Sequence, residues 1–211
     1  AGNLQYWVNK AREQGHEVLI EIPMEAHEYG RMKMHPQTLL SEDTGQQNRP
    51  RLERLLSRAS GYFGVINYQG AKFAEDSEAV GSVLQTLSER GVALIEDGSF
   101  QAGAFDDAAG QTGLKYARAA STIDAKLTAD DIRNELLGLE TLAKEGGASL
   151  GAGYAFPLTI EIAKDWTQDL QNRGVLLAPA SALTAEIPAE KSEPQPVQTG
   201  SLLQAPLNPE G

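Results

Sequence analysis

The sequence predicts an α/β fold in which parallel strands alternate with helices. Apolar residues recur at helical spacing in several segments, and short β-rich runs lie between those segments. Three of the predicted helices end at a glycine, and a predicted strand follows after at most two residues. Strict alternation of this kind requires helical crossovers between parallel strands. An open doubly wound sheet and a barrel both fit this order, and both place reactive residues at the carboxyl ends of the strands.

The predicted helices show apolar residues at i, i+3, i+4 and i+7, which is the stripe of a helix packed on a core. The three clearest stripes are Leu4/Trp7/Val8/Ala11, Leu52/Leu55/Leu56/Ala59 and Val80/Val83/Leu84/Leu87. A helix containing Ile132 begins with Thr128 and Asp131 at the spacing of a capping box. The last helix contains Trp166 and has Pro157 near its first turn, and a weaker helix is expected over 100–112.

The predicted strands are short runs of β-branched and apolar residues, and several are apolar at nearly every position. This pattern is typical of strands that are buried on both faces. The runs span residues 18–22, 63–67, 92–96, 148–151 and 175–178, of which 148–151 is the weakest. The glycines that close the preceding helices favour the left-handed turn that ends a helix. They are Gly15, Gly91 and Gly174.

Composition excludes several function classes. The chain of 211 residues has 18 Lys and Arg against 29 Asp and Glu, a net charge of −11, which argues against nucleic-acid and anionic-membrane partners. The lack of cysteine excludes disulfides, thiolate metal sites and a cysteine nucleophile, and all three histidines lie within the first 35 residues. No apolar run approaches the ~18 residues of a membrane span. Residues 1–184 are expected to form one domain, followed by a disordered, proline-rich tail over 185–211.

Polar and aromatic side chains lie at or just after the ends of the predicted strands and would meet at one edge of the sheet. Aromatic rings beside carboxylates and amides suit sugars, which have apolar faces and hydroxyl edges. The candidate residues are Glu21, Glu25, Asn67, Tyr68, Lys72, Asp97, Tyr154 and Phe156. Phosphate-binding, dinucleotide-binding and serine-hydrolase motifs are absent from the sequence.

Each candidate also has a structural interpretation. Asp97 precedes Gly98 and would cap the next helix. Lys72 would be solvated or pair with Glu75, and the tyrosines Tyr68 and Tyr154 would be core aromatics with hydrogen-bonded hydroxyls.

In order along the chain, these segments resemble the divergent polysaccharide deacetylase family, a bacterial branch of the NodB-like carbohydrate esterases. The resemblance covers about residues 3–183, in the segments 15–19, 23–25, 67–73, 96–99, 153–159 and 177–183. It implies a deformed (β/α) barrel that removes acetyl groups from amino sugars or polysaccharides with the help of a divalent metal, zinc in the family. It also implies a periplasmic or cell-envelope location and a glycan partner.

The sequence departs from the family pattern at the metal site. The family's Ile-Asp-Asp strand is absent, so the chain is expected to be truncated at its N-terminus and to lack the first strand or strands of the barrel. Family histidines are replaced by Glu21, Tyr68, Tyr154 and Phe156. The implied assignments are metal ligation by Glu21 and Glu25, catalysis by Asp97 and Tyr154, and substrate binding by Asn67, Tyr68, Lys72 and Phe156.

Three hypotheses follow from this departure. The first is a metal-dependent deacetylase of a cell-envelope glycan, in which a carboxylate site would favour ions harder than zinc. The second is an inactive member, holding no metal, that binds a glycan or a partner protein. The third is an envelope scaffold in which the strand-end loops have only structural roles.

Overall fold

The main sheet has five strands in the order β1-β2-β3-β4-β7. The computed structural model describes residues 3–28, 35–43, 45–100 and 103–186. The strands are β1 (Leu19–Met24), β2 (Gly64–Gln69), β3 (Ala93–Glu96), β4 (Lys115–Arg118) and β7 (Ala185–Glu186). The first four are parallel, and β7 pairs antiparallel with β4. The predicted α/β class with parallel strands is confirmed.

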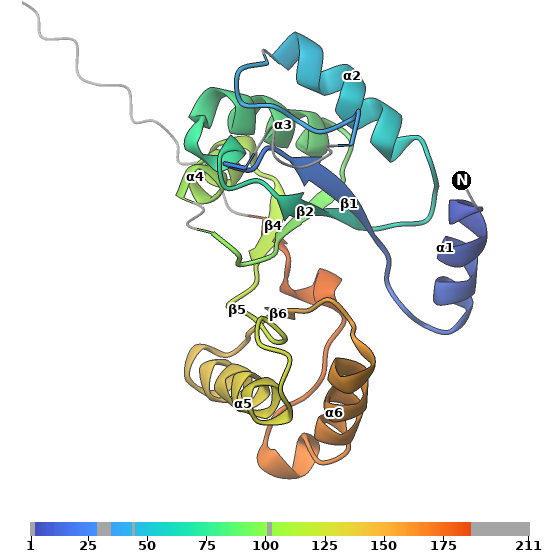
Figure 1. The fold of residues 1–211 in the computed structure, drawn as a ribbon, viewed down its shortest axis with the longest axis vertical. Helices are drawn as coiled ribbons and strands as arrows, with labels where there is room; N and C mark the ends of the chain where they lie inside the picture. The colour runs from blue at the N-terminus through green and yellow to red at the C-terminus, as the bar shows by residue number, and fades with distance from the viewer. Residues whose placement is uncertain (1–2, 29–34, 44, 101–102, 187–211) are drawn as a thin grey trace, which may run out of the picture.

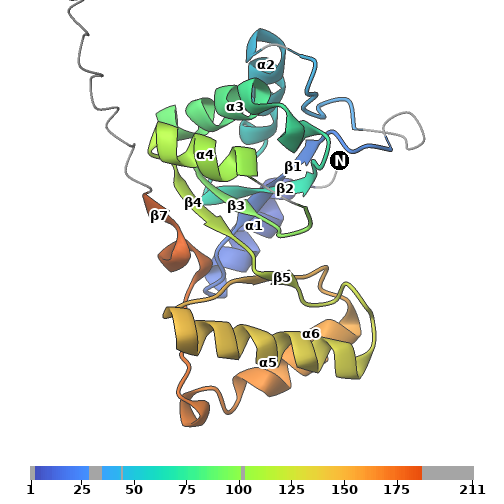
Figure 2. The same cartoon turned by 90° about the vertical axis from the view of Figure 1, so that its left-hand side faces the viewer.

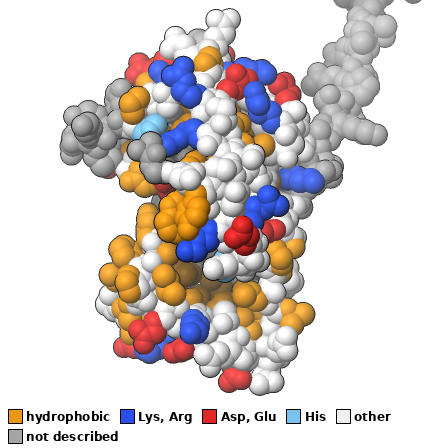
Figure 3. Space-filling model, turned by 90° about the vertical axis from the view of Figure 1, so that its right-hand side faces the viewer, with side chains coloured by type: hydrophobic (Ala, Val, Ile, Leu, Met, Phe, Trp, Pro, Cys, Tyr) orange, Lys and Arg blue, Asp and Glu red, His pale blue; other side chains and the backbone are white. Residues whose placement is uncertain are grey.

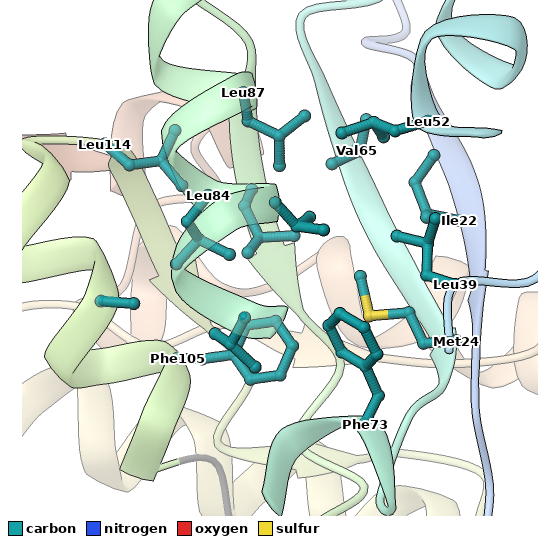
Figure 4. Packing of buried hydrophobic residues seen from close by; sticks show 14 of the residues in the cluster. Ile22, Met24, Leu39, Leu52, Val65, Phe73, Leu84, Leu87, Phe105 and Leu114 are labelled. Carbon is teal, nitrogen blue, oxygen red and sulfur yellow. The ribbon is translucent and has the colours of Figure 1, made fainter. Parts of the chain in front are cut away.

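Three helices cover one face of this sheet (Figure 1). They are α2 (Gly45–Leu56), α3 (Ser77–Glu89) and α4 (Gly103–Thr112). Between them and the sheet lies the larger core, where Ile22 and Met24 of β1 meet Phe73 and Leu52 (Figure 4). Because side chains alternate across a strand, Glu21 of β1 points to the opposite face.

A second, smaller unit lies on the side of the main sheet away from α2–α4 (Figure 2). It consists of the strands β5 (Ser121–Thr122) and β6 (Gly151–Ala152) with the helices α5 (Ala129–Gly146) and α6 (Pro157–Thr167), and we call it the α5–α6 unit. Its own core is small. The buried residues are Ile132, Leu136, Leu139 and Ile162.

The predicted helix boundaries are confirmed where a local signal defined them. The backbone N–H of Asp131 donates to the hydroxyl of Thr128 at 3.2 Å, so the capping box begins α5 as expected. Pro157 occupies the first turn of α6. Gly15 and Gly91 directly follow the caps of the helices Leu4–Glu13 and Ser77–Glu89 as predicted, whereas Gly174 closes the short 3-10 helix Gln171–Arg173, because α6 already ends at Thr167. All three glycines have a left-handed backbone. Their φ angles are +83° at Gly15, +65° at Gly91 and +81° at Gly174.

Four expectations about single elements change. Residues 175–178 form no strand, because this segment finds no strand to pair with, and its leucines Leu176 and Leu177 are exposed. The predicted strand over 148–151 shortens to β6, and the strands β4, β5 and β7 were not predicted from the sequence. In α1 (Leu4–Glu13), Val8 is buried but Trp7 is 60% exposed, so the stripe covers less of the core than its spacing indicated.

The end of the chain is described only in part. Ala185 and Glu186, expected to begin the tail, form β7, and the rest of that tail, 187–211, lies outside the described residues. Among the helices that are described, none has both the length and the apolar character that crossing a bilayer requires.

Candidate functional site

The strand ends are held together by Asn67. The β1–β2 register places Asn67 opposite Ile22, and the Asn67 side chain is buried. Its Oδ1 accepts from the backbone N–H of Asp97 at 2.8 Å, and its Nδ2 donates to the carbonyl of Gln69 at 2.8 Å. Asn67, predicted to bind substrate, therefore fixes the end of β2 against the end of β3.

Glu25 and Lys72 form an ion pair inside the molecule. Glu25 is fully buried just after β1, and its Oε1 lies 2.6 Å from Nζ of Lys72. Its Oε2 accepts from the backbone N–H and the hydroxyl of Ser41, at 2.9 and 2.7 Å. Burial alone would raise the pKa of Glu25, but the hydrogen bonds from Lys72 and Ser41 outweigh burial and lower it. Both oxygens of this predicted metal ligand are thus occupied, and Lys72 pairs with it rather than with Glu75.

Glu21 has different surroundings from Glu25. It is exposed on the face of β1 that points away from the larger core. Partial burial, and then the negative charge of Asp97, raise the pKa of Glu21, which places the two carboxylates near one another. Within the described part of the chain, no three His, Asp or Glu side chains gather in a way that could hold a metal ion.

Three aromatic side chains are exposed beside these carboxylates. Tyr68 is 44%, Tyr154 63% and Phe156 41% exposed, and the rings of Tyr154 and Phe156 lie 6.2 Å apart at 48°. Partial burial raises the pKa of Tyr154, followed by the charges of Asp97, Tyr68, Asp124 and Glu21. Sequence reasoning therefore brought together residues that do lie close in space. We call the set Glu21, Tyr68, Asp97, Tyr154 and Phe156 the aromatic–acidic rim.

Asp124 positions the part of the rim that comes from the α5–α6 unit. It is buried, and its two carboxylate oxygens accept from the backbone N–H of Tyr154 at 3.0 and 2.9 Å. One of them also accepts from the hydroxyl of Thr159 at 2.9 Å. Sequence reasoning missed Asp124, because its partners lie 30 and 35 positions later. The one signal was an acid between the apolar residues Ile123 and Ala125.

The backbone is strained next to both rim tyrosines. Among the described residues other than glycine, only Gln69 and Ala155 have positive φ, +59° and +55°. Each directly follows a rim tyrosine, Tyr68 or Tyr154. Strain of this kind is found mainly where the surrounding structure holds a functional group in place.

Glu96 is a second buried acid that sequence reasoning did not select. Its Oε1 accepts from the N–H of Gly98 at 2.8 Å, and its Oε2 lies 2.6 Å from Nε of Arg118. Burial raises the pKa of Glu96 to about 7 even though both of these contacts oppose the rise. The neighbouring Asp97 accepts from the N–H of Ser99 at 2.9 Å in a tight turn. Since α4 begins only at Gly103, Asp97 is not the cap of that helix.

The surface is hollowed between the main sheet and the α5–α6 unit, and hydrophobic side chains surround the hollow (Figure 3). A cavity of about 650 Å³ lies within the α5–α6 unit, between its two helices and the segment that follows them. None of the predicted site residues lines this cavity, whose walls include leucines and Trp166 as well as the charged residues Glu140 and Lys144. The candidate site is therefore the exposed rim.

Comparison with known proteins agrees with the resemblance seen in the sequence. The uncharacterized protein YibQ of Escherichia coli K12 is 24% identical over 200 residues, which cover 95% of this chain and 61% of the relative. An uncharacterized protein, ATU2773, from Agrobacterium tumefaciens C58 has a crystal structure that matches with a TM-score of 0.83 and 31% identity. That match covers 87% of this chain and 74% of the solved one. A family model described as divergent polysaccharide deacetylase matches residues 1–184, and the protein belongs to this family.

Proposed function

We propose that this protein binds an amino-sugar polysaccharide of the cell envelope or periplasm at the aromatic–acidic rim. The observation that supports this function is the exposure of three aromatic rings beside two carboxylates, Glu21 and Asp97. Sugar rings stack their apolar faces on aromatic side chains, while carboxylates accept hydrogen bonds from their hydroxyls. Family membership agrees with a polysaccharide as the ligand.

The contacts beneath the rim support binding, because they fix the backbone segments that carry the rim side chains. Asn67 holds the turn that carries Asp97, and Asp124 holds the loop that carries Tyr154 and Phe156. A binding surface that is ordered in advance loses less conformational entropy when the ligand arrives. The rim residues come from four separate segments of the chain, with Glu21 inside β1 and the others at strand ends or in loops, and can contact more than one sugar unit.

The test is titration calorimetry of the protein with chitin- and chitosan-derived oligosaccharides. Tyr68→Ala and Tyr154→Ala should each weaken binding by roughly fivefold to tenfold, the effect of losing one aromatic contact. Tyr6→Ala is the matched control, since Tyr6 is a similarly exposed tyrosine of α1 whose ring contacts Trp7. Absence of binding by any oligosaccharide, or equal affinity of both rim variants and the control, would contradict the proposal.

Deacetylation is a second candidate function, favoured by the exposed carboxyl group of Glu21. Partial burial and the charge of Asp97 raise the pKa of Glu21, and a carboxyl group with a raised pKa can serve as a general acid or base. In this function Asp97 would orient a catalytic group, and the Tyr154 hydroxyl would donate to the developing oxyanion. The described residues do not fit the zinc site that the family implies, because they include no cluster of three ligands and Glu25 is paired with Lys72.

Acetate release from N-acetylated chitooligosaccharides tests this second function, with Mg²⁺, Ca²⁺ and Zn²⁺ added in separate reactions. Asp97→Asn should abolish release while leaving oligosaccharide binding within about threefold of the original, because a near-isosteric amide keeps its contacts. Failure to detect acetate with every metal would reject deacetylation and leave the binding proposal standing.

A further inference from the structure

Three carboxylates lie at or directly beneath the rim. Glu21 and Asp97 belong to it, and Asp124 is buried and accepts from the backbone N–H of Tyr154. These three carboxylates help to raise the pKa of Tyr154, and Asp97 likewise raises the pKa of Glu21. A ligand at the rim therefore meets a negative electrostatic potential.

Two cations on the adjoining strand ends contact carboxyl groups of the interior. Lys72 Nζ lies 2.6 Å from the buried Glu25, and Arg118 Nε lies 2.6 Å from the buried Glu96. Both cations bind carboxylates of the interior rather than those of the rim. Of the Lys and Arg side chains in the described ranges, none forms an ion pair with Glu21 or Asp97.

Some other acidic side chains of the protein are paired with cations. Glu53, for example, pairs with Arg90 at 2.8 Å, and Glu140 pairs with Arg173 at 2.9 Å. Glu21 and Asp97 instead lie near exposed aromatic rings. Carboxylates next to aromatic faces are complementary to an organic cation, which gains charge-assisted hydrogen bonds and cation–π contacts together.

We propose that the aromatic–acidic rim selects sugars that carry a protonated amine, such as unacetylated glucosamine units, over their N-acetylated counterparts. This inference rests on the proposed glycan-binding function and specifies its ligand. A neutral acetamido sugar keeps the stacking contacts but has no charge to offer Glu21 and Asp97. An anionic sugar is repelled by both.

The experiment compares three oligosaccharides of equal length by titration calorimetry at about pH 6, where a sugar amine is protonated. The probes are glucosamine, N-acetylglucosamine and galacturonic acid oligomers. The glucosamine oligomer should bind at least tenfold more tightly than the acetylated one, and galacturonate should bind least. Raising the salt from about 50 to 500 mM should weaken the first interaction and leave the second nearly unchanged.

Near-isosteric variants then assign the preference to the rim. Glu21→Gln and Asp97→Asn should each weaken binding of the glucosamine oligomer by at least roughly threefold more than they weaken binding of the acetylated oligomer. Glu135→Gln, which neutralises an exposed glutamate of α5, is the control and should leave the preference unchanged. Circular dichroism confirms that each variant is folded before its titration is interpreted.

The outcomes separate the two proposals. Equal or tighter binding of the acetylated oligomer would overturn the inference but not the proposed function. A full preference for glucosamine in the Glu21→Gln/Asp97→Asn double variant would also overturn it, since another site would then carry the selectivity. If none of the three oligosaccharides binds, the proposed function itself fails.

Discussion

Replacement of Asp124 is the sharpest test of how the rim is built. Its carboxylate accepts from the Tyr154 N–H and from the Thr159 hydroxyl, at distances between 2.9 and 3.0 Å. Asp124→Ala removes both acceptors and leaves two donors without a partner. Each unsatisfied buried donor costs about 1–3 kcal/mol, and the Tyr154 N–H lies at the lower end because water can reach its exposed side. The free energy of unfolding should therefore fall by about 2–4 kcal/mol.

The assay is urea unfolding at pH 7 followed by circular dichroism, together with the glycan titration described above. For a chain of this size, a loss of about 3 kcal/mol corresponds to a melting temperature lower by roughly 6–12 °C. Binding should weaken at least as much as in Tyr154→Ala, because the whole 153–156 loop loses its anchor. Asp124→Asn keeps one acceptor, so its stability and its glycan affinity should both lie between those of Asp124→Ala and those of the original protein.

The reasoning would be refuted if the free energies of unfolding of Asp124→Ala and the original protein differed by less than about 0.5 kcal/mol and the two proteins bound glycan equally well. Arg133→Ala provides the baseline, since its exposed ion pair with Asp130 should contribute little. A loss of stability with unchanged glycan affinity would show that Asp124 anchors α6 but not the rim.

Three further predictions concern stability. Glu25→Gln breaks the pair with Lys72 and should lower the free energy of unfolding by about 1–3 kcal/mol at pH 7. Because the native pKa of Glu25 is lowered, the pair stabilises the protein above about pH 4.5 and this stabilisation disappears in acid. The urea midpoints of Glu25→Gln and the original protein should therefore converge near pH 3. The native pKa of Glu96 is raised to about 7, so the free energy of unfolding of the original protein should fall by up to about 3 kcal/mol as the pH rises from 4.5 to 8. Glu96→Gln should remove this pH dependence, which a series of unfolding curves at different pH values would show. In α1, thermal melts should show that Val8→Ala, at a buried position, costs about 1–3 kcal/mol and that Trp7→Ala, at an exposed one, costs less than about 1 kcal/mol.

Local sequence signals were sufficient for much of the fold. The capping box at Thr128, the proline at the start of α6 and glycines such as Gly91 each act within a few residues, so their effects can be predicted without tertiary contacts. The near-continuous apolar runs identified β1, β2 and β3 because most residues of these strands are buried. β3 is buried on both faces, and β1 and β2 are buried mainly on the face toward the larger core. Residues 175–178 carry the same signal but lack a pairing strand, which a linear pattern does not reveal.

The candidate site was predictable in position but not in the state of each side chain. Parallel strands bring Asp97 and Tyr68 to one edge whatever their neighbours are. The pairing of Glu25 with Lys72 joins residues 47 positions apart, and it converts an expected metal ligand into part of the interior. Asp124 was missed for the same reason, since its role depends on a loop that is distant in the sequence.

The two separate cores have a consequence for how the molecule opens. Tyr68 and Asp97 belong to the sheet with the large core, whereas Tyr154 and Phe156 belong to the α5–α6 unit, whose core has only four buried side chains among the described residues. A small core opens at lower free energy, so amides of α5 should exchange with deuterium earlier than those of β2. A ligand that touches both parts would hold them together and slow exchange in α5 most, so hydrogen-exchange mass spectrometry could locate glycan binding from a helix that the glycan does not contact.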